Sequence, residues 1–347
     1  MSSPKNSEIR IALDAMGGDF APRNEVQGAV LALRELPDKL RIILVGDENK
    51  IAEELKKAEY SGDKIQIRHA AEVITMHDSP SKAVKEKKDS SLVVAANLVK
   101  NDEADALVSA GNTGAVGVAS IFIIGRIKGV SRPTIAAPIP NEKRSFTYIS
   151  DAGAFVDSKP DHLVEFATLT ATYLSEVYGV KNPSVGLLNV GEEESKGLKF
   201  TKETFDLMKK TDLNFIGNIE GRDIFKGTVD IALCDGFIGN LLLKQAESML
   251  SFLKTKFKQY AETSLIAKLQ IGLAVPAIKK ALYDADVDNV GGTPLLGING
   301  ITIIGHGSSK PKGIKNMILQ AAKAFDADLV NKLKEAIENE HERTQSS

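Results

Sequence analysis

Five glycine-rich segments follow short apolar runs, and each carries polar side chains that can take part in chemistry. They read IALDAMGGD (11–19), SAGNTGA (109–115), LLNVGEEESKG (187–197), LCDGFIGN (233–240) and IIGHGSS (303–309). In an open α/β sheet, ligands bind outside the carboxyl ends of the strands. The five segments therefore predict one shared cleft that is built from distant parts of the chain.

The SAGNTGA segment is a candidate anion site. Backbone N–H groups at the start of a helix favour an anion, and glycine lets a ligand approach the main chain closely. Asn112 and Thr113 add side-chain donors, and Ser109, Gly111 and Gly114 complete the candidate set. The alternative is a tight turn with an Asn or Thr helix cap. Neither GxxxxGKS, GxxxxGKT nor GxGxxG occurs here, so the segment is not a standard nucleotide-binding loop.

Two further segments offer groups that stabilise developing negative charge. Lys196 lies on a loop between two glycines, where its ammonium can neutralise phosphate or polarise a carbonyl. A solvated run of charges is the alternative. Asn240 and the backbone after Gly239 can donate hydrogen bonds to an oxyanion at a helix start, with Asp235 orienting them. The alternative for Asp235 is helix capping, and for Cys234 a buried, inert thiol.

Asp19 and His306 are second-rank candidates for substrate contact. Asp19 follows the first strand and can orient a substrate group or cap the helix that begins near Pro22. His306 stands beside Ser308 and Ser309, but the chain has no GxSxG motif, which argues against a serine hydrolase. A polar ligand contact or a helix cap fits these residues better.

Composition excludes several classes of protein. The chain has 347 residues, 43% of them hydrophobic, and a net charge of −2, which argues against a general nucleic-acid binder. A single cysteine and five scattered histidines predict neither a disulfide framework nor a metal site. No apolar run reaches the roughly 18 residues of a membrane span, and no signal peptide is evident. We therefore expect a cytoplasmic protein without a metal or cofactor.

Alternating strand and helix patterns predict a mainly parallel sheet with right-handed crossovers. A polar turn between 134–139 and 146–150 predicts an antiparallel hairpin. We expect one large α/β catalytic domain over 1–335 and a polar tail over 336–347, of which 341–347 should be frayed. The other expected strands are 9–13, 41–45, 65–68, 106–109, 184–190, 213–217, 229–234 and 301–305, and the expected helices are 22–36, 51–58, 80–100 with a break near 89–90, 113–127 and 160–178.

Residues 241–282 form an expected amphipathic helical insertion. Apolar residues recur there at spacings of three and four, and 254–282 holds six lysines against one glutamate. Pro276 is expected to break or kink the helix, which suggests two helices with an apolar elbow over 271–278. Such a surface suits an anionic membrane face or a dimer interface. The candidate contact residues are Leu269, Leu273, Val275, Ile278, Lys279 and Lys280.

An ordered set of motifs extends over nearly the whole chain: LVSAGNTGA, SRPTIA, VDSKPDHLVEFA, GNIEGRDIF, VDIALCDGFIGN and GGTPLLG. Together they resemble the bacterial phosphate acyltransferase family (PlsX, acyl-acyl-carrier-protein:phosphate acyltransferases). The resemblance implies a three-layer αβα fold with a mostly parallel sheet, like the isocitrate and isopropylmalate dehydrogenases and the phosphotransacetylases. It also implies a homodimer that converts acyl-acyl-carrier-protein and inorganic phosphate to acyl phosphate. That product would feed the membrane glycerol-3-phosphate acyltransferase of phospholipid synthesis.

The residues are consistent with this chemistry without a cofactor, since phosphate is a nucleophile and a thioester is already activated. We expect direct attack by phosphate, with Lys196 pairing with phosphate or the oxyanion and Asn240 donating to the carbonyl. Asn112 and the SAGNTGA backbone would hold the anion. The basic insertion would also suit an acidic carrier protein, and the enzyme would associate peripherally with the inner face of the membrane. Phe155 and Ser158 depart from the family, which usually has Asn and often Cys there.

Three other functions compete with this interpretation. A phosphotransacetylase that uses acyl-coenzyme A shares the fold and the chemistry but has a different carrier. A metal- and NAD-dependent decarboxylating dehydrogenase shares the fold, but the chain lacks a recognisable acidic cluster for the metal. A non-catalytic scaffold has no need of five polar strand ends.

Overall fold

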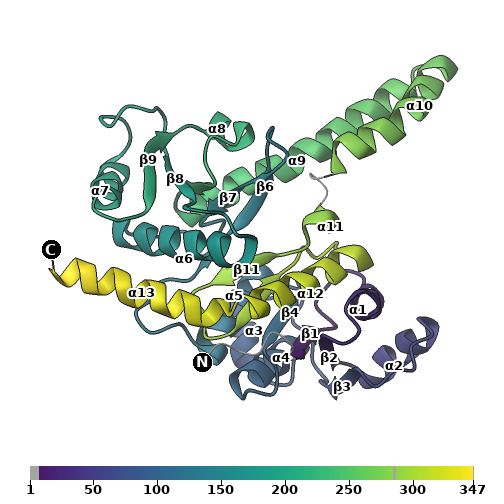
Figure 1. Ribbon diagram of the computed structural model, residues 1–347. Coiled ribbons are helices and arrows are strands. Elements are labelled where there is room, and N and C mark those ends of the chain that lie inside the picture. The colour runs from purple at the N-terminus through teal and green to yellow at the C-terminus, as the bar shows by residue number, and fades with distance from the viewer. Residues whose placement is uncertain (1–7, 284–286, 347) are drawn as a thin grey trace.

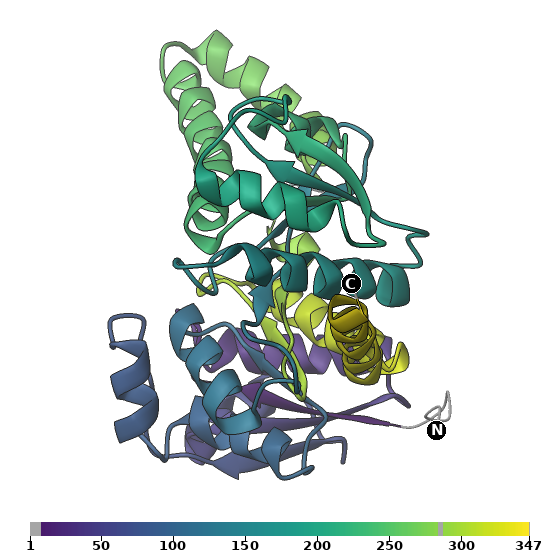
Figure 2. The same ribbon diagram turned by 90° about the vertical axis from the view of Figure 1, so that its left-hand side faces the viewer.

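The computed structural model describes residues 8–283 and 287–346, which form two α/β halves and a projecting helical arm (Figures 1 and 2). The larger half is built on a seven-stranded sheet in the order β3-β2-β1-β4-β12-β11-β5. Neighbouring strands among β3, β2, β1, β4 and β12 pair parallel. At one end of the sheet, β11 pairs antiparallel with both β12 and β5. The strands are β1 (Ile9–Asp14), β2 (Leu40–Gly46), β3 (Ile65–His69), β4 (Ala106–Ser109), β5 (Thr134–Ile135), β11 (Thr293–Leu296) and β12 (Ile301–Ile304).

Helices cover both faces of this sheet because its strands bury side chains on both sides. Ile11 and Leu13 of β1 pack into one core cluster with α1 and α12, whereas Ala12 belongs to a second cluster with α4 and α5. This half therefore has three layers. Its helices are α1 (Arg23–Glu35), α2 (Glu48–Lys57), α3 (Pro80–Glu86), α4 (Ser91–Lys100), α5 (Thr113–Ala119), the π-helix (Ser120–Ile124), α11 (Val287–Val290) and α12 (Pro311–Asp326).

The smaller half has its own five-stranded sheet in the order β6-β7-β10-β8-β9. All pairs are parallel except β6 with β7, which is the antiparallel hairpin expected from the sequence. The strands are β6 (Ala137–Pro140), β7 (Phe146–Ser150), β8 (Ser184–Leu188), β9 (Asn214–Ile219) and β10 (Ile231–Leu233), and the helices are α6 (Pro160–Tyr178), α7 (Lys199–Met208), α8 (Gly221–Lys226) and α13 (Leu329–Ser346).

The mostly parallel α/β fold is confirmed, but the strands divide between two sheets where one was expected. The fraying predicted for 341–347 is wrong for the described residues 341–346, because α13 continues through Ser346. Ile337 is buried, and Arg343 forms an ion pair with Asp212 at 2.7 Å. This helix packs along α6, so its inner face is apolar although its sequence is polar on average.

The arm consists of α9 (Gly236–Ala261) and α10 (Leu265–Ala281), which project together from the body (Figures 1 and 2). The expected break at Pro276 is wrong, since Pro276 lies inside α10. The helices separate at 262–264, where Ser264 caps α10 by accepting the N–H of Ala267 at 3.0 Å. Gly272, four residues before Pro276, has open space around it, so water can hydrate the carbonyl that proline leaves without a partner.

No helix in 8–283 or 287–346 has both the length and the apolar character that a bilayer crossing requires.

Candidate functional site

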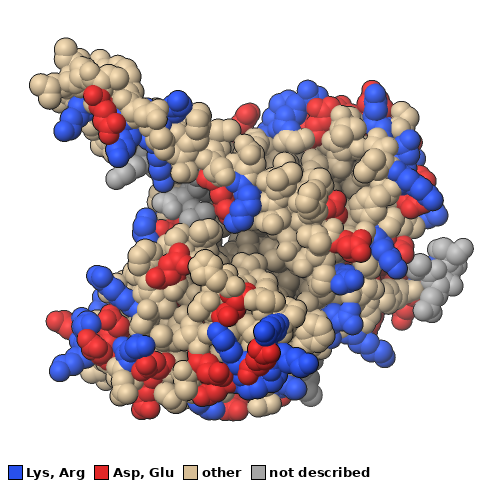
Figure 3. All heavy atoms as spheres, turned by 180° about the vertical axis from the view of Figure 1, so that it is seen from behind, with Lys and Arg blue, Asp and Glu red and all other residues tan. Residues whose placement is uncertain are grey.

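A cavity of about 600 Å³ lies between the two sheets, at the carboxyl ends of their strands. The molecule is hollowed between its two halves on the face seen in Figure 3. Most of the lining is apolar and comes from β5, β6, α8 and α9, including Ile135, Ile139, Phe225, Leu242 and Leu243. Thr113, Asn240 and His306 add polar groups at three of the glycine-rich strand ends. The cavity thus combines a large apolar volume with a few polar groups, as ligand sites generally do.

Three of the glycine turns contact one another beside this cavity. A Cβ on Gly17 would lie 3.0 Å from the Cα of Gly111, and one on Gly18 would lie 3.4 Å from the carbonyl oxygen of Gly307. The N–H of Asp19 donates to that same Gly307 oxygen at 2.8 Å. Of the five segments, 109–115, 233–240 and 303–309 contribute lining residues to the cavity, and 11–19 contacts two of these turns without lining it.

Ser109 stabilises these turns through two hydrogen bonds. Its hydroxyl donates to Asp14 Oδ2 at 2.8 Å and accepts the N–H of Gly111 at 3.1 Å, and both side chains are buried. Burial raises the pKa of Asp14 above its ordinary value, while hydrogen bonds from Ser91 and Ser109 oppose this shift. The Ser109 hydroxyl is thus engaged in the turn and does not line the cavity.

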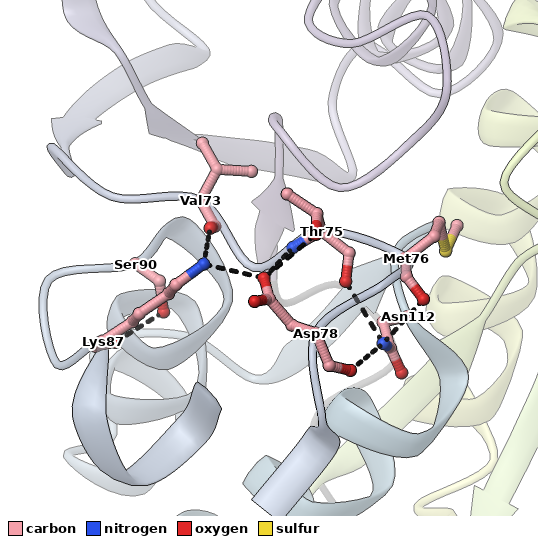
Figure 4. A network of polar contacts seen from close by, with 7 residues as sticks. All are labelled: Val73, Thr75, Met76, Asp78, Lys87, Ser90 and Asn112. Carbon is pink, nitrogen blue, oxygen red and sulfur yellow. Dashed lines mark hydrogen bonds and ion pairs between the residues drawn. The ribbon is translucent and has the colours of Figure 1, made fainter. Parts of the chain in front are cut away.

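Asn112 is a helix cap, so its predicted role as an anion donor is wrong. Its Oδ1 accepts the N–H of Ala115 at 3.1 Å. Its Nδ2 donates to the carbonyl oxygens of Thr75, Met76 and Asp78 at 3.2, 3.4 and 3.1 Å (Figure 4). Because both N–H groups of the amide face main-chain carbonyls, Asn112 binds the 75–78 loop.

The 75–78 loop is a part of the site that the sequence analysis missed. Asp78 Oδ2 accepts hydrogen bonds from the Thr75 N–H at 2.7 Å, the Thr75 hydroxyl at 3.0 Å and Lys87 Nζ at 2.7 Å (Figure 4). Lys87, followed by Thr75, lowers the pKa of Asp78 to about 2. Met76 reaches Gly307, where its Cε would block a Cβ. The loop therefore packs against the turn that carries His306.

Asn240 projects from the second turn of α9 and lines the cavity. Asp235 caps this helix, as its Oδ1 accepts the N–H groups of Phe237 at 2.9 Å and Ile238 at 3.0 Å. The capping alternative for Asp235 is thus confirmed. Asn240 also packs against Gly153, where a Cβ would lie 2.9 Å from that of Asn240 and the backbone φ is +120°.

Asp151 fixes the loop that faces Asn240. It is fully buried directly after β7. Its Oδ1 accepts the N–H of Ile135 at 2.9 Å and the Thr134 hydroxyl at 3.3 Å, and its Oδ2 accepts the N–H of Phe155 at 2.9 Å. Burial raises the pKa of Asp151, although hydrogen bonds from main-chain N–H groups stabilise the charged form and oppose this shift. The sequence signal for this residue, an acid followed by glycine at a strand end, resembled that of Asp14.

Lys196 lies outside the residues that line the cavity. It is exposed on the loop between β8 and α7, at the carboxyl edge of the second sheet. The neighbouring acids have other partners, since Glu192 pairs with Arg222 at 3.3 Å and Glu194 with Lys209 at 3.4 Å. Within the described part of the chain, Lys196 forms no ion pair, so its charge remains free. We expected its loop to share the cleft, but no residue of 187–197 lines the cavity.

The second-rank candidates follow β1 and β12, at the carboxyl edge of the seven-stranded sheet. His306 lines the cavity, and its Nδ1 is 2.8 Å from the Ser308 hydroxyl. Asp19 is exposed and takes part in the turn contacts through its backbone.

The expected surface residues of the insertion all lie on α10. Leu269 and Leu273 are exposed, as is Lys280, whereas Val275 and Ile278 are half-buried. The side chain of Lys279 lies outside the described residues.

Comparisons with known proteins identify the family. Residues 9–332 match the family model described as "Fatty acid synthesis protein". The chain is 47% identical over 331 residues to the phosphate acyltransferase of Pelotomaculum thermopropionicum, which covers 95% of this chain and 96% of the relative. The chain belongs to the phosphate acyltransferase family. The resemblance inferred from the ordered motifs is confirmed.

Solved structures show that this phosphate acyltransferase shares its fold with phosphotransacetylases. A Streptococcus pyogenes phosphotransacetylase aligns with a TM-score of 0.58 at 16% identity, over 92% of this chain and 96% of that one. A branched-chain phosphotransacylase from Enterococcus faecalis aligns with a TM-score of 0.56 at 13% identity, over 91% and 98%. The phosphotransacetylase-like fold expected from the sequence is confirmed.

The two departures from the expected family pattern lie in the Asp151 loop and the segment after it. The guanidinium of Arg132 stacks over the Phe155 ring at 4.5 Å. The Ser158 hydroxyl is buried, and among the described residues it has no hydrogen-bond partner.

Replacing Asp151 with Asn should destabilise this phosphate acyltransferase. The side-chain NH₂ of Asn would face main-chain N–H groups that donate to the Asp151 carboxylate in the unchanged protein. Each buried N–H group that loses its acceptor lowers the free energy of unfolding by roughly 2 kcal/mol. We expect a free energy of unfolding lower by about that amount in urea denaturation. Asp157→Asn, an exposed change in the adjoining segment, is the control. Equal stability of the two variants would contradict the assigned role.

Proposed function

We propose that this phosphate acyltransferase transfers a long-chain fatty acyl group from acyl carrier protein to inorganic phosphate. The observation that carries the proposal is the apolar cavity with Thr113, Asn240 and His306 at its strand ends. A cavity of about 600 Å³ falls in the range of pockets that bury most of a ligand of drug size. Its lining favours an extended hydrocarbon chain, because burying apolar surface stabilises the complex by about 25 cal/mol per Å².

The polar end of the cavity supports direct attack by phosphate. A phosphate oxygen forms a bond to the thioester carbonyl carbon, the C–S bond breaks, and the thiolate leaves on the carrier and takes a proton. The amide of Asn240 donates to the carbonyl oxygen as negative charge develops there. Thr113 and Gly114 line the cavity as the first residues of α5, where backbone N–H groups lack partners within the helix. These groups bind phosphate, and His306 faces it.

Lys196 supplies positive charge from the neighbouring loop. Its free ammonium at the carboxyl edge of the second sheet attracts phosphate and offsets the charge of the transition state. No residue acts as a covalent nucleophile in this scheme. Cys234 supports that view, because burial raises the pKa of its thiol well above the ordinary value and keeps it protonated.

The arm supplies surfaces for partners. Exposed aromatic and aliphatic side chains along α9, among them Phe252 and Phe257, support a homodimer. The end of the arm is the most apolar part, with Leu265 86%, Ile266 71% and Leu269 65% exposed. Lysines accompany these side chains (Figure 3). This combination supports contact with an anionic membrane and with an acidic carrier protein.

Peripheral contact with the inner face of the membrane suits the product. Acyl phosphate carries a long apolar chain, and its proposed consumer is the membrane glycerol-3-phosphate acyltransferase.

Acyl phosphate formation tests the proposed function and the two charge-stabilising residues. Purified protein incubated with palmitoyl-acyl-carrier-protein, phosphate and hydroxylamine should give acyl hydroxamate only when phosphate is present. Asn240→Ala and Lys196→Met should each lower kcat by roughly 10²-fold or more, as loss of an oxyanion donor does. Lys199→Met, an equal loss of charge three residues away, should retain the rate.

Three results would contradict parts of this proposal. A Lys196→Met rate near that of Lys199→Met would remove Lys196 from the mechanism. A faster reaction with palmitoyl-coenzyme A than with the carrier protein would favour a phosphotransacetylase. Absence of product from a folded protein would favour a scaffold.

Narrowing the cavity should change the preference for chain length. Ala246 of α9 lines the cavity, so Ala246→Phe fills part of the space in which we place the acyl chain. We expect kcat/KM to fall at least tenfold for palmitoyl-acyl-carrier-protein and much less for the octanoyl form, measured as acyl hydroxamate. Ser248→Phe is the control, because Ser248 is exposed on the same helix and is not among the lining residues. An equal loss for both chain lengths would argue against this cavity as the acyl site.

A charge at the end of the arm should weaken membrane binding. Leu269→Glu removes an exposed apolar side chain and adds a negative charge that anionic lipids repel. We expect the bound fraction in co-sedimentation with phosphatidylglycerol-containing vesicles to fall severalfold. Thr255→Glu, exposed on α9 farther from the end, should have a smaller effect. If both variants bind like the unchanged protein, the end of the arm is not the membrane contact.

A further inference from the structure

The carboxyl group of Glu25 is buried beneath the Gly17–Asp19 turn. Glu25 belongs to α1 and is 1% exposed. The main-chain N–H of Gly18 faces one of its oxygens, and Gly18 lies so close that any Cβ there would overlap Glu25 Oε1. Among the described residues, Oε2 has no hydrogen-bond partner. A buried carboxyl group with one oxygen on a site turn and the other unsatisfied calls for a functional explanation.

The charged groups around Glu25 make its ionisation costly. Burial is the main cause that raises its pKa to about 8; hydrogen bonds from the main-chain N–H groups of Glu25 and Gly18 oppose this shift, and the negative charges of Asp14 and Asp19 add to it. The neighbouring loop and α12 offer no opposing cation: His306 bonds to Ser308, and Lys310 pairs with Asp288. In the described parts of the chain, no lysine or arginine forms an ion pair with Glu25. The neutral carboxylic acid is therefore the form that fits this place at pH 7.

The turn is the part that would move if Glu25 became charged. Helix α1 is held against α12, because Gly28 meets Ile314 so closely that a Cβ would lie 2.5 Å from that of Ile314. The turn is less buried, and Asp19 is exposed. Gly17 and Gly18 contact the segments that carry Gly111 and Gly307, which continue into Thr113 and His306 of the cavity lining. A shift of the turn would therefore displace groups that line the proposed phosphate site.

We propose that Glu25 is a positioning residue that holds the Gly17–Asp19 turn in its active arrangement while neutral, and releases it on losing its proton. The rate effect rests on the proposed function, whereas the effects on stability and on the turn itself do not. The direction of the stability effect follows from the pKa values of the two states. The folded protein keeps this proton up to about pH 8, but the unfolded chain loses it near pH 4.5. Stability contributed by the neutral form is therefore lost progressively between these values and changes little above them.

Glu25→Gln tests the proposal because the amide has the same shape and cannot ionise. The difference in Tm between Glu25→Gln and the unchanged protein should grow from pH 5 to pH 8 and then level off. The ratio of the rates at pH 9 and pH 7 should be about tenfold higher in Glu25→Gln, since one pH unit above a pKa leaves about a tenth of the acid neutral. Glu35→Gln is the matched control, as Glu35 is exposed on the same helix and pairs with Lys315 at 2.6 Å. It should follow the unchanged protein in both measurements.

Glu25→Ala completes the set, because it removes the support of the turn at every pH. Its rate should be low at pH 7 with a raised KM for phosphate, and Glu25→Gln should restore both. Parallel pH profiles for Glu25→Gln and Glu35→Gln would overturn the proposal. A change in the Tm profile with an unchanged rate profile would also overturn it, because Glu25 would then be structural only.

Amide hydrogen exchange at Gly18 and Asp19 provides a test that does not depend on catalysis. Above pH 8 these amides should exchange faster in the unchanged protein than in Glu25→Gln at the same pH. This comparison still decides the role of Glu25 if no acyl phosphate forms under any condition. Equal exchange in the two proteins would refute the release of the turn.

Discussion

The site depends on direct contact between main chains at the carboxyl ends of β1, β4 and β12. A Cβ on Gly17 would lie only 3.0 Å from the Cα of Gly111, and the turn that holds Gly18 contacts Gly307 through the Asp19 N–H, which donates to the Gly307 oxygen at 2.8 Å. The segments 11–19 and 109–115, almost 100 positions apart in the sequence, can approach this closely because neither has a side chain at the contact. The cavity lining at Thr113 and His306 takes its position from this contact. A side chain at Gly17 would push the turns after β1 and β4 apart and so disturb the polar end of the cavity.

Buried carboxyl groups hold these turns in both halves of the molecule. Asp14 binds the turn after β1 through Met16 and Ser109, and Asp151 binds the loop after β7 through Ile135 and Phe155. Main-chain N–H groups in a tight turn have no strand or helix partner, so a carboxylate is an efficient acceptor for several of them at once. These hydrogen bonds offset only part of the cost of burying the charge, since burial still raises the pKa of both carboxyl groups. Glu25 differs, because it has fewer donors and two acidic neighbours.

Local patterns predicted the strands and the glycine ends well, since apolar runs and glycines act over a few residues. Relations between distant segments could not be predicted in the same way. Asn112 reads as an anion donor until the 75–78 carbonyls, which come from another part of the chain, are placed around it. Lys196 follows β8 and lies outside the cavity lining, whereas Asn240 follows the neighbouring strand β10 and lines it. An apolar run does not encode which strand of a sheet will border the cavity. Pro276 lies inside a helix because the surrounding chain is open to water.

Helix α9 connects the polar end of the cavity, its apolar lining and the arm. Its first turns carry Asn240, the next turns line the cavity with Leu242, Leu243 and Ala246, and its outer half presents Phe252 and Phe257 in the arm. One rigid element of 26 residues thus runs from the proposed reacting carbonyl, along the proposed acyl chain, to the exposed apolar surface. A partner or membrane that fixes the arm must also restrict α9 at the cavity, because a helix transmits displacement along its axis. In this fold, the proposed membrane contact of the arm and the geometry of the proposed acyl site are therefore linked through a single helix.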